Sequence, residues 1–252
     1  MLQVIVTLTR HSIEYDILAS DETKTFYPQH HLLPEEIMVV DPLAGILYAH
    51  DAIKVAVEHA IHMGATVYDH THVDHIEEVS DGVIIYANGK KYKVEKVVIT
   101  TGPFIHELIP ELATHIHVRR LIGTWFSVKD SQVFSPEQFP IFIREFCDKS
   151  IYGLPSIDGK IANVSLKARE QDKIICPQDI HKPIKEAQLK EISQFVRTFL
   201  PDLDYQPAYV KTSIEAYTDN DIPIIGYLPS YQHLLVATGF SGHGFKMAPV
   251  IG

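Results

Sequence analysis

The residues with the clearest chemical potential lie near the end of the sequence, in the segment Gly239–Lys246, which reads GFSGHGFK. Its three glycines follow an apolar run and precede the start of a helical pattern. Small residues at such a turn let backbone N–H groups approach an anion or a planar ring, and the helix N-terminus adds partial positive charge. Lys246 adds a full charge. The order G-x-x-G-x-G is not the usual dinucleotide fingerprint, so spacing alone leaves a tight turn without a ligand open.

Histidines are the other side chains that invite a chemical interpretation. His70 and His72 would share one face of a strand, with His75 close by in sequence. A metal site usually needs further ligands and neighbours that hold them in place. Surface histidines on a hairpin are therefore the preferred interpretation, and the same holds for His115 and His117. We predict no metal site.

The elements that would position these residues alternate between helix and strand. Apolar residues at helical spacing predict helices over residues 51–63, capped by Asp51, and 184–200. Asn88-Gly89 is a strong signal for a two-residue hairpin turn. The N-terminal run MLQVIVTLTR alternates like a strand. Periodicity predicts further strands over residues 66–72, 73–79, 83–87, 96–100, 122–128, 141–146, 161–166 and 233–238.

Composition narrows the class of protein. With 46% hydrophobic and 21% charged residues, the 252-residue chain resembles an ordinary globular protein of one large or two interleaved domains. A net charge of -10 without a Lys/Arg cluster argues against a nucleic-acid surface. No apolar run is long enough to cross a membrane, and no signal peptide is recognisable, so we expect a cytoplasmic protein. Cys147 and Cys176 form no metal-ligand pattern and are expected to stay reduced.

The C-terminal string VATGFSGHGFKMAPVIG closely resembles the flavin-binding segment of the D-amino-acid oxidase superfamily, in its sarcosine oxidase and N-methyltryptophan oxidase branch. Other motifs of that family occur in the same order, and the resemblance runs from about His11 to the end. They are a D-P-x-A-G turn at Asp41–Gly45, a T-A-G-x-W turn at Thr100–Phe104, a Y-G-x-P strand at Tyr152–Pro155 and a shortened D-x-x-P-I-I-G run at Asp221–Gly226.

The resemblance implies a mixed α/β (α+β) fold, with an incomplete, Rossmann-like FAD-binding domain interleaved with an antiparallel-sheet substrate domain. Residues 51–102 and 226–252 would form the discontinuous FAD-binding part. Residues 11–50 and 103–225 would form the substrate-binding domain.

The resemblance also implies roles for single residues. Lys246 would pair with the substrate carboxylate, and Tyr152 and Tyr217 would line the substrate pocket. Lys160 is a candidate for the family's oxygen-activating lysine, on a segment that is shorter here. The residues implied in cofactor binding are Thr101, Gly102, Gly239, Phe240, Ser241, Gly242, His243, Gly244, Phe245 and Lys246.

The sequence also departs from the family pattern. No G-x-G-x-x-G follows an N-terminal strand, so we expect the family's N-terminal FAD-binding unit to be missing and a complementing N-terminal chain to be a possible partner. The family's FAD-attaching cysteine is replaced by Glu215. Because a carboxylate cannot form the thioether, FAD should be bound non-covalently.

The implied function is oxidation of a secondary or N-methylated amino acid, of the sarcosine type, to an imine. Oxygen would be the electron acceptor and hydrogen peroxide a product. Two alternatives stay open: an FAD-dependent dehydrogenase with another acceptor, and a catalytically inactive fragment or subunit. The sequence does not identify the substrate or the oligomeric state.

Overall fold

The computed structural model describes residues 2–146, 148–168, 171–174 and 176–252. The chain forms two compact units, each assembled from separate stretches of sequence. Unit 1 comprises Met1–Ile46, Ile122–Glu170 and Lys182–Thr212, and unit 2 comprises Leu47–Leu121, Gln171–His181 and Ser213–Gly252. The two units are defined by packing, whereas the two domains predicted from the sequence are defined by the ligand that each would bind. Which residues bind the cofactor and which bind the substrate therefore stays a prediction.

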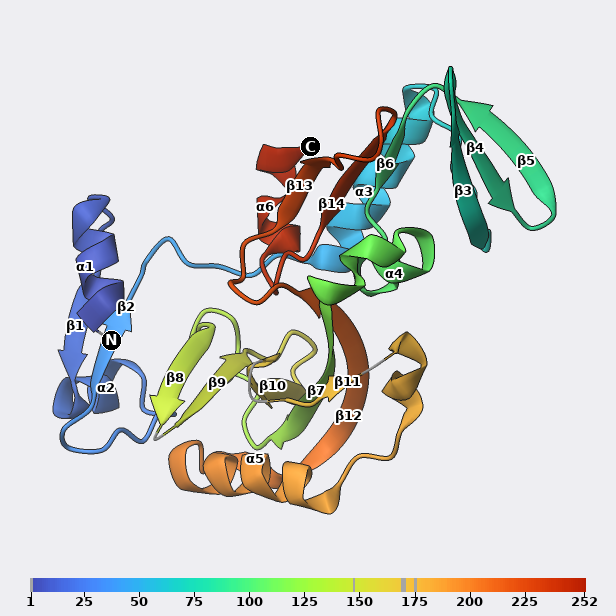
Figure 1. Ribbon diagram of the computed structural model, residues 1–252. Coiled ribbons are helices and arrows are strands. Elements are labelled where there is room, and N and C mark those ends of the chain that lie inside the picture. The colour runs from blue at the N-terminus through green and yellow to red at the C-terminus, as the bar shows by residue number, and fades with distance from the viewer. Residues whose placement is uncertain (1, 147, 169–170, 175) are drawn as a thin grey trace. The chain divides into compact units, whose positions relative to one another are not determined.

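Unit 1 is built around antiparallel strands. Strands β8, β9 and β10 follow one another in the sheet, and β10 pairs with the second half of β7. Helix α5 packs against these strands through a core rich in phenylalanine, and in Figure 1 it is the orange helix beneath them. The elements are α1 (Leu2–Arg10), β1 (Asp16–Ala19), α2 (Ser20–Phe26), β2 (Ile37–Val40), β7 (His117–Val128), β8 (Phe142–Phe146), β9 (Lys149–Leu154), β10 (Ile161–Leu166), α5 (Glu186–Phe199) and β12 (Leu203–Tyr217).

Strands β7 and β12 run through both units, and their first and last residues respectively belong to unit 2. Unit 2 also holds a three-stranded meander, β3–β4–β5, and a sheet in the order β13–β14–β6 (Figure 1). Its other elements are α3 (Ala49–His62), β3 (Val73–Val79), β4 (Gly82–Ala87), β5 (Lys90–Val94), β6 (Val97–Ile99), η1 (Gly102–Phe104), α4 (Ile105–Leu108), η2 (Pro110–Thr114), β11 (Lys173–Ile174), η4 (Pro177–His181), β13 (Ile224–Tyr227), β14 (Leu234–Thr238) and α6 (Gly244–Ile251).

Strand β14 runs parallel to β6, with Leu235 beside Val98 and Val236 beside Ile99. Val236 and Ile99 are buried against α4 and η2, whereas Val98 on the opposite face is 62% exposed. One face of this sheet is therefore buried and the other is exposed to solvent.

Two predictions about strands are wrong. Residues 2–10 form helix α1 rather than a strand, and Thr7 and Thr9 donate side-chain hydrogen bonds to carbonyls four residues earlier. These bonds satisfy the hydroxyls on a helix, and a short apolar run cannot be assigned from periodicity alone. Residues 66–72 form no strand.

Helix α3 was predicted correctly in position. None of its described residues is buried, and Ile53 is 55% exposed. Tyr48 occupies the N-cap position, and Asp51 lies in the first turn instead. Among the described residues, no helix is long and apolar enough to cross a membrane.

The N-terminal part of unit 1 is held by buried polar contacts. Arg144 donates to both carboxylate oxygens of Glu36 and, over 3.1 Å, to the carbonyl of His31. Its guanidinium carbon lies 3.7 Å from the ring centroid of Phe199. Beside it, His30 stacks on Phe139 with ring centroids 4.9 Å apart. Burial, reinforced by the charge of Arg144, lowers the pKa of His30 from 6.5 to about 3.

Candidate functional site

The carboxyl ends of β6 and β14 carry the first predicted site residues. Because the two strands are parallel, Thr101–Gly102 after β6 and the loop after β14 emerge at the same edge of the sheet. The hydroxyl of Thr238 lies 3.5 Å from the carbonyl oxygen of Gly102. Gly102 has a φ of +53°, and a Cβ there would meet no atom within 4 Å. Its backbone therefore faces open space.

The loop after β14 is closely fitted to the end of β12. Gly239 has a φ of +69°, and a Cβ there would lie 2.7 Å from a methyl group of Thr218. Ser241 is buried, with a φ of +52°. Its N–H donates to the carbonyl of Ala216 over 3.1 Å, and its hydroxyl accepts the N–H of Thr218 over 3.2 Å. These bonds fix the conformation of the loop. The sequence motif showed only the spacing of its small residues and did not predict these bonds.

A carboxylate and a phenol meet beside this loop. The hydroxyl of Tyr217 donates to Oε2 of Glu215 over 2.8 Å, and the backbone of Tyr217 bridges that of Phe240. A Cβ at Gly242, where φ is +83°, would lie 3.2 Å from the Tyr217 hydroxyl and 3.7 Å from Glu215 Oε2. The glycine therefore keeps the loop close to this polar pair.

The last part of the loop starts helix α6. His243 takes the N-cap position, and its carbonyl accepts the N–H of Met247 over 3.2 Å. The ammonium of Lys246 lies 3.2 Å from Nδ1 of His243, and both side chains are exposed. Gly244 is packed against Phe240, because a Cβ there would lie 3.0 Å from the Cβ of Phe240. The positive charge of Lys246 thus lies in the first turn of α6, beside the glycine loop.

Two predicted site residues belong to unit 1. Tyr152 lies on β9, opposite Ser165 of β10 and Ile143 of β8. Lys160 is exposed in the turn before β10, where its N–H donates to Asp158 over 2.8 Å. Their predicted roles, next to residues of unit 2, stay predictions.

Sequence reasoning missed the contacts around the start of β7. Nε2 of His117 lies 2.6 Å from Oδ1 of Asp219. The guanidinium carbon of Arg119 lies 5.4 Å from the ring centroid of Tyr217. Glu215 and Tyr217 could have been paired from their spacing, because residues two apart share one face of a strand. The partners of His117 and Arg119 lie about a hundred residues away in sequence, so no local pattern signals them.

Histidines of the predicted hairpin lie near its turn. His70 has a φ of +49° and His75 stacks on Tyr86 with ring centroids 3.9 Å apart. Within the described ranges, no three His, Cys, Asp or Glu side chains come together in a way that could hold a metal ion. Cys176 is a free thiol, and Cys147 lies outside the described residues.

The chain is similar in sequence to curated oxidases. The chain is 27% identical over 254 residues to human peroxisomal sarcosine oxidase, covering 97% of this chain and 64% of that protein. It is 27% identical over 231 residues to N-methyl-L-tryptophan oxidase of Salmonella newport, covering 90% of this chain and 60% of that one.

A solved structure supports the fold. NikD, an unusual amino acid oxidase essential for nikkomycin biosynthesis, matches 98% of this chain and 65% of its own with a TM-score of 0.83 at 17% identity. The mixed α/β fold with antiparallel sheets is thus confirmed. The chain spans 64% of the length of the human relative. The model of one family, described as FAD dependent oxidoreductase, matches residues 3–252, and the chain belongs to that family.

Proposed function

We propose that the chain takes part in FAD-dependent oxidation of a secondary or N-methylated amino acid to an imine, with oxygen as acceptor and hydrogen peroxide as product. The observation that carries the proposal is the shared edge of β6 and β14. There Thr101–Gly102, the loop from Gly239 to Gly244 and the Glu215–Tyr217 pair converge within unit 2.

The residues present suit a flavin. Gly102 leaves its backbone open, and the lack of a side chain at Gly242 lets the loop backbone lie close to the Tyr217 hydroxyl. Backbone N–H groups at such glycines can donate to an anionic or polar ring edge. Bound FAD would supply the acceptor for the hydride from the carbon next to the substrate nitrogen. Thr101, Phe240, Ser241, His243 and Phe245 complete the proposed binding set with these glycines, Gly239 and Gly244.

Lys246 is proposed to hold the substrate carboxylate. An ammonium on a flexible stem makes a strong charge-assisted hydrogen bond to a carboxylate where water is excluded. Tyr217, fixed by its bond to Glu215, is proposed to line the substrate pocket. Tyr152 keeps its proposed role in substrate binding. Glu215 stands at the family's attachment position, so FAD would be held non-covalently. Lys160 keeps its proposed role toward oxygen.

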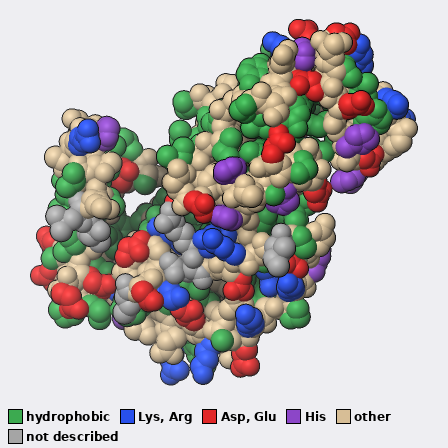
Figure 2. Space-filling view, viewed as in Figure 1, with side chains coloured by type: hydrophobic (Ala, Val, Ile, Leu, Met, Phe, Trp, Pro, Cys, Tyr) green, Lys and Arg blue, Asp and Glu red, His purple; other side chains and the backbone are tan. Residues whose placement is uncertain are grey.

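A further segment is proposed to cover the open face of the β13–β14–β6 sheet. Val98, Ile225 and Tyr227 on that face are 62%, 47% and 54% exposed. Figure 2 shows hydrophobic side chains gathered over α6 and this sheet, whereas the β3–β4–β5 meander carries charged and histidine side chains. Parallel strands are normally covered on both faces. A strand–helix FAD-binding segment, on this polypeptide or a complementing chain, fits this face and the open edge of β6.

The visible spectrum tests cofactor binding first. We expect the protein to acquire a flavin spectrum with FAD and to release all flavin into the supernatant on acid precipitation. Flavin that stays in the pellet would contradict non-covalent binding. If the chain alone stays colourless, the same titration is repeated with a G-x-G-x-x-G-containing βαβ segment from a relative. No binding in either case would sink the proposal for this chain and leave the inactive-subunit alternative.

Substrate turnover tests the reaction. Sarcosine added without oxygen should bleach the flavin absorbance, and air should restore it with one hydrogen peroxide per imine formed. Lys246→Gln should raise the KM for sarcosine about tenfold or more, because a hydrogen bond to a charged group contributes about 1.5–3 kcal/mol. Lys90→Gln, the same change on the exposed end of β5, is the matched control. Bleaching without peroxide in air would favour the dehydrogenase alternative.

A further inference from the structure

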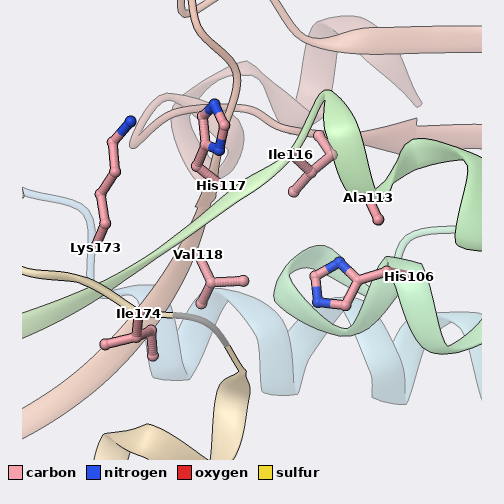
Figure 3. Close-up of a pocket in the computed structure, with 7 residues that line it drawn as sticks. All are labelled: His106, Ala113, Ile116, His117, Val118, Lys173 and Ile174. Carbon is pink, nitrogen blue, oxygen red and sulfur yellow. The ribbon is translucent and has the colours of Figure 1, made fainter.

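A cavity in unit 2 is formed by residues outside the proposed flavin site. It has a volume of about 330 Å³, at the lower end of the range of small-molecule sites. It shares no lining residue with the glycine loop, with Thr101–Gly102 or with the Glu215–Tyr217 pair. Figure 3 shows side chains from α4, β7 and β11 around it.

Aliphatic side chains form most of the wall. Ile116 and Val118 are 3% exposed, and Ile116 belongs to the core of unit 2, so this part of the wall is fixed by packing. Ile174 is held in place because β11 pairs with β7, with Ile174 opposite Val118. Ala113, on η2, is exposed. Such a wall suits the apolar part of a ligand.

The charged side chain among the residues that line the cavity is a hydrogen-bond donor. Lys173, adjacent to Ile174 on β11, brings an ammonium, and Figure 3 shows it extended beside His117. Nε2 of His117 is already engaged by Asp219 over 2.6 Å. Among the described residues that line the cavity, none carries a carboxylate. The excess of donors favours an anionic ligand over a cationic one.

His106 supplies the observation that points to an occupant. Both of its ring nitrogens are shielded from solvent and have no hydrogen-bond partner among the described residues. A buried polar group without a partner costs about 1–3 kcal/mol. In Figure 3 its ring reaches from α4 towards Val118 and Ile116. The torsion of an imidazole about its Cβ–Cγ bond is soft, so a small rotation would turn one nitrogen to a ligand in the cavity.

We propose that this cavity binds a small carboxylate with a short apolar or aromatic tail. In Figure 3 the ammonium of Lys173 points away from His106, so the lysine turns on its flexible four-carbon stem to hold the carboxylate together with an N–H of His106. Ile116, Val118 and Ile174 surround the tail. Its lining residues are not those of the proposed oxidation site, although Ile116 lies against Gly239, and the proposal does not depend on FAD.

Benzoate is the probe, with benzyl alcohol and benzylamine as controls that keep the ring and change the charge. Isothermal titration is done on the Lys246→Gln chain, so that the proposed substrate-anchoring lysine does not contribute. Benzoate should bind one per chain and at least about tenfold more tightly than benzyl alcohol, which corresponds to about 1.4 kcal/mol. Benzylamine should not bind measurably.

Variants locate the binding. Lys173→Gln should weaken benzoate binding about tenfold or more, whereas Lys90→Gln, an equal change of charge on β5, should leave it unchanged. Ala113→Trp fills the opening from an exposed position and should abolish binding without loss of thermal stability. The ¹⁵N signals of the His106 imidazole should move on addition of benzoate.

The proposal fails if benzoate does not bind, if benzylamine binds as tightly, or if Lys173→Gln and Lys90→Gln bind benzoate equally. Binding that survives Ala113→Trp would place the ligand elsewhere and would also overturn it. The benzoate titrations contain no FAD. Failure of the chain to bind FAD in a separate titration would therefore count only against the proposed oxidation.

Discussion

Strand β10 of unit 1 and strand β6 of unit 2 lie in different surroundings. In unit 1, successive residues Ala162, Asn163, Val164 and Ser165 of β10 are all buried, so both faces of that strand are covered. In unit 2, β6 buries Ile99 but exposes Val98. A short apolar run therefore indicates a strand without indicating how many of its faces are covered. The difference teaches that unit 1 covers both faces of β10, whereas unit 2 leaves one face of β6 open to another segment.

The largest expected effect comes from truncating the core of unit 1. Phe126 is fully buried, and Phe126→Ala should lower the free energy of unfolding by about 3–5 kcal/mol. On the open face, the smaller truncation Val98→Ala should cost less than about 1 kcal/mol. Urea unfolding followed by circular dichroism measures both. A loss of about 1.5–3 kcal/mol at Val98 would show that the face around it is covered in solution.

Acid should weaken unit 1 through His30. Its pKa is about 3 in the fold, against an ordinary value of 6.5, so the unfolded chain binds the proton first as the pH falls. Stability is thus full above about pH 6.5 and is lost between that pH and about 3, at about 1.4 kcal/mol per pH unit. At pH 5 the loss is about 2 kcal/mol.

His30→Phe isolates this effect from the protonation of carboxylates, because it keeps a ring against Phe139 and Phe142. Its unfolding free energy should fall less steeply between pH 6.5 and 4.5 than that of the unchanged protein. Parallel pH profiles would mean that His30 is not the titrating group.

An intermediate effect is expected at the glycine loop of unit 2. Gly242→Ala places a Cβ 3.2 Å from the Tyr217 hydroxyl at a φ of +83°, which should cost about 1–2 kcal/mol and weaken flavin binding. Gly45→Ala, in unit 1, meets no atom within 4 Å and serves as the control. Thermal unfolding and FAD titration are the measurements. Unchanged flavin affinity in Gly242→Ala would argue against the loop as part of the cofactor site.

The smallest change in stability is expected on α3. Ile53 is 55% exposed, so Ile53→Gln should alter the free energy of unfolding by no more than about 0.5 kcal/mol. Self-association, measured by light scattering, should nevertheless decrease, because exposed apolar patches promote contacts between molecules. A large loss of stability instead would reveal that this helix is packed in solution.

The sequence predicted elements whose signals are local. Asn88 and Gly89, with φ of +48° and +73°, form the expected hairpin turn, and β10 and α5 lie where periodicity placed them. The strand predicted at the N-terminus is a helix, because a nine-residue apolar run fits either period. The exposure of α3 was not predictable, since an amphipathic pattern does not say whether a partner covers it.

In the candidate site, too, features with a local sequence signal were predicted and long-range contacts were not. The order of glycines and the following helix located the loop, and parallel pairing of β6 and β14 brought Gly102 beside it. The bond between Glu215 and Tyr217 depends on side-chain rotamers, and the contact of His117 with Asp219 depends on chain topology. Neither of these two contacts can be predicted from a short stretch of the sequence.

Ser241 has a consequence for how this region opens. Its N–H is held by Ala216, and its hydroxyl engages the N–H of Thr218 and the carbonyl of Gly239. The amides of 218 and 241 therefore become accessible to solvent deuterons only when the loop lifts off β12. Their exchange rates report one shared opening event, although the neighbouring Gly242 and His243 are exposed.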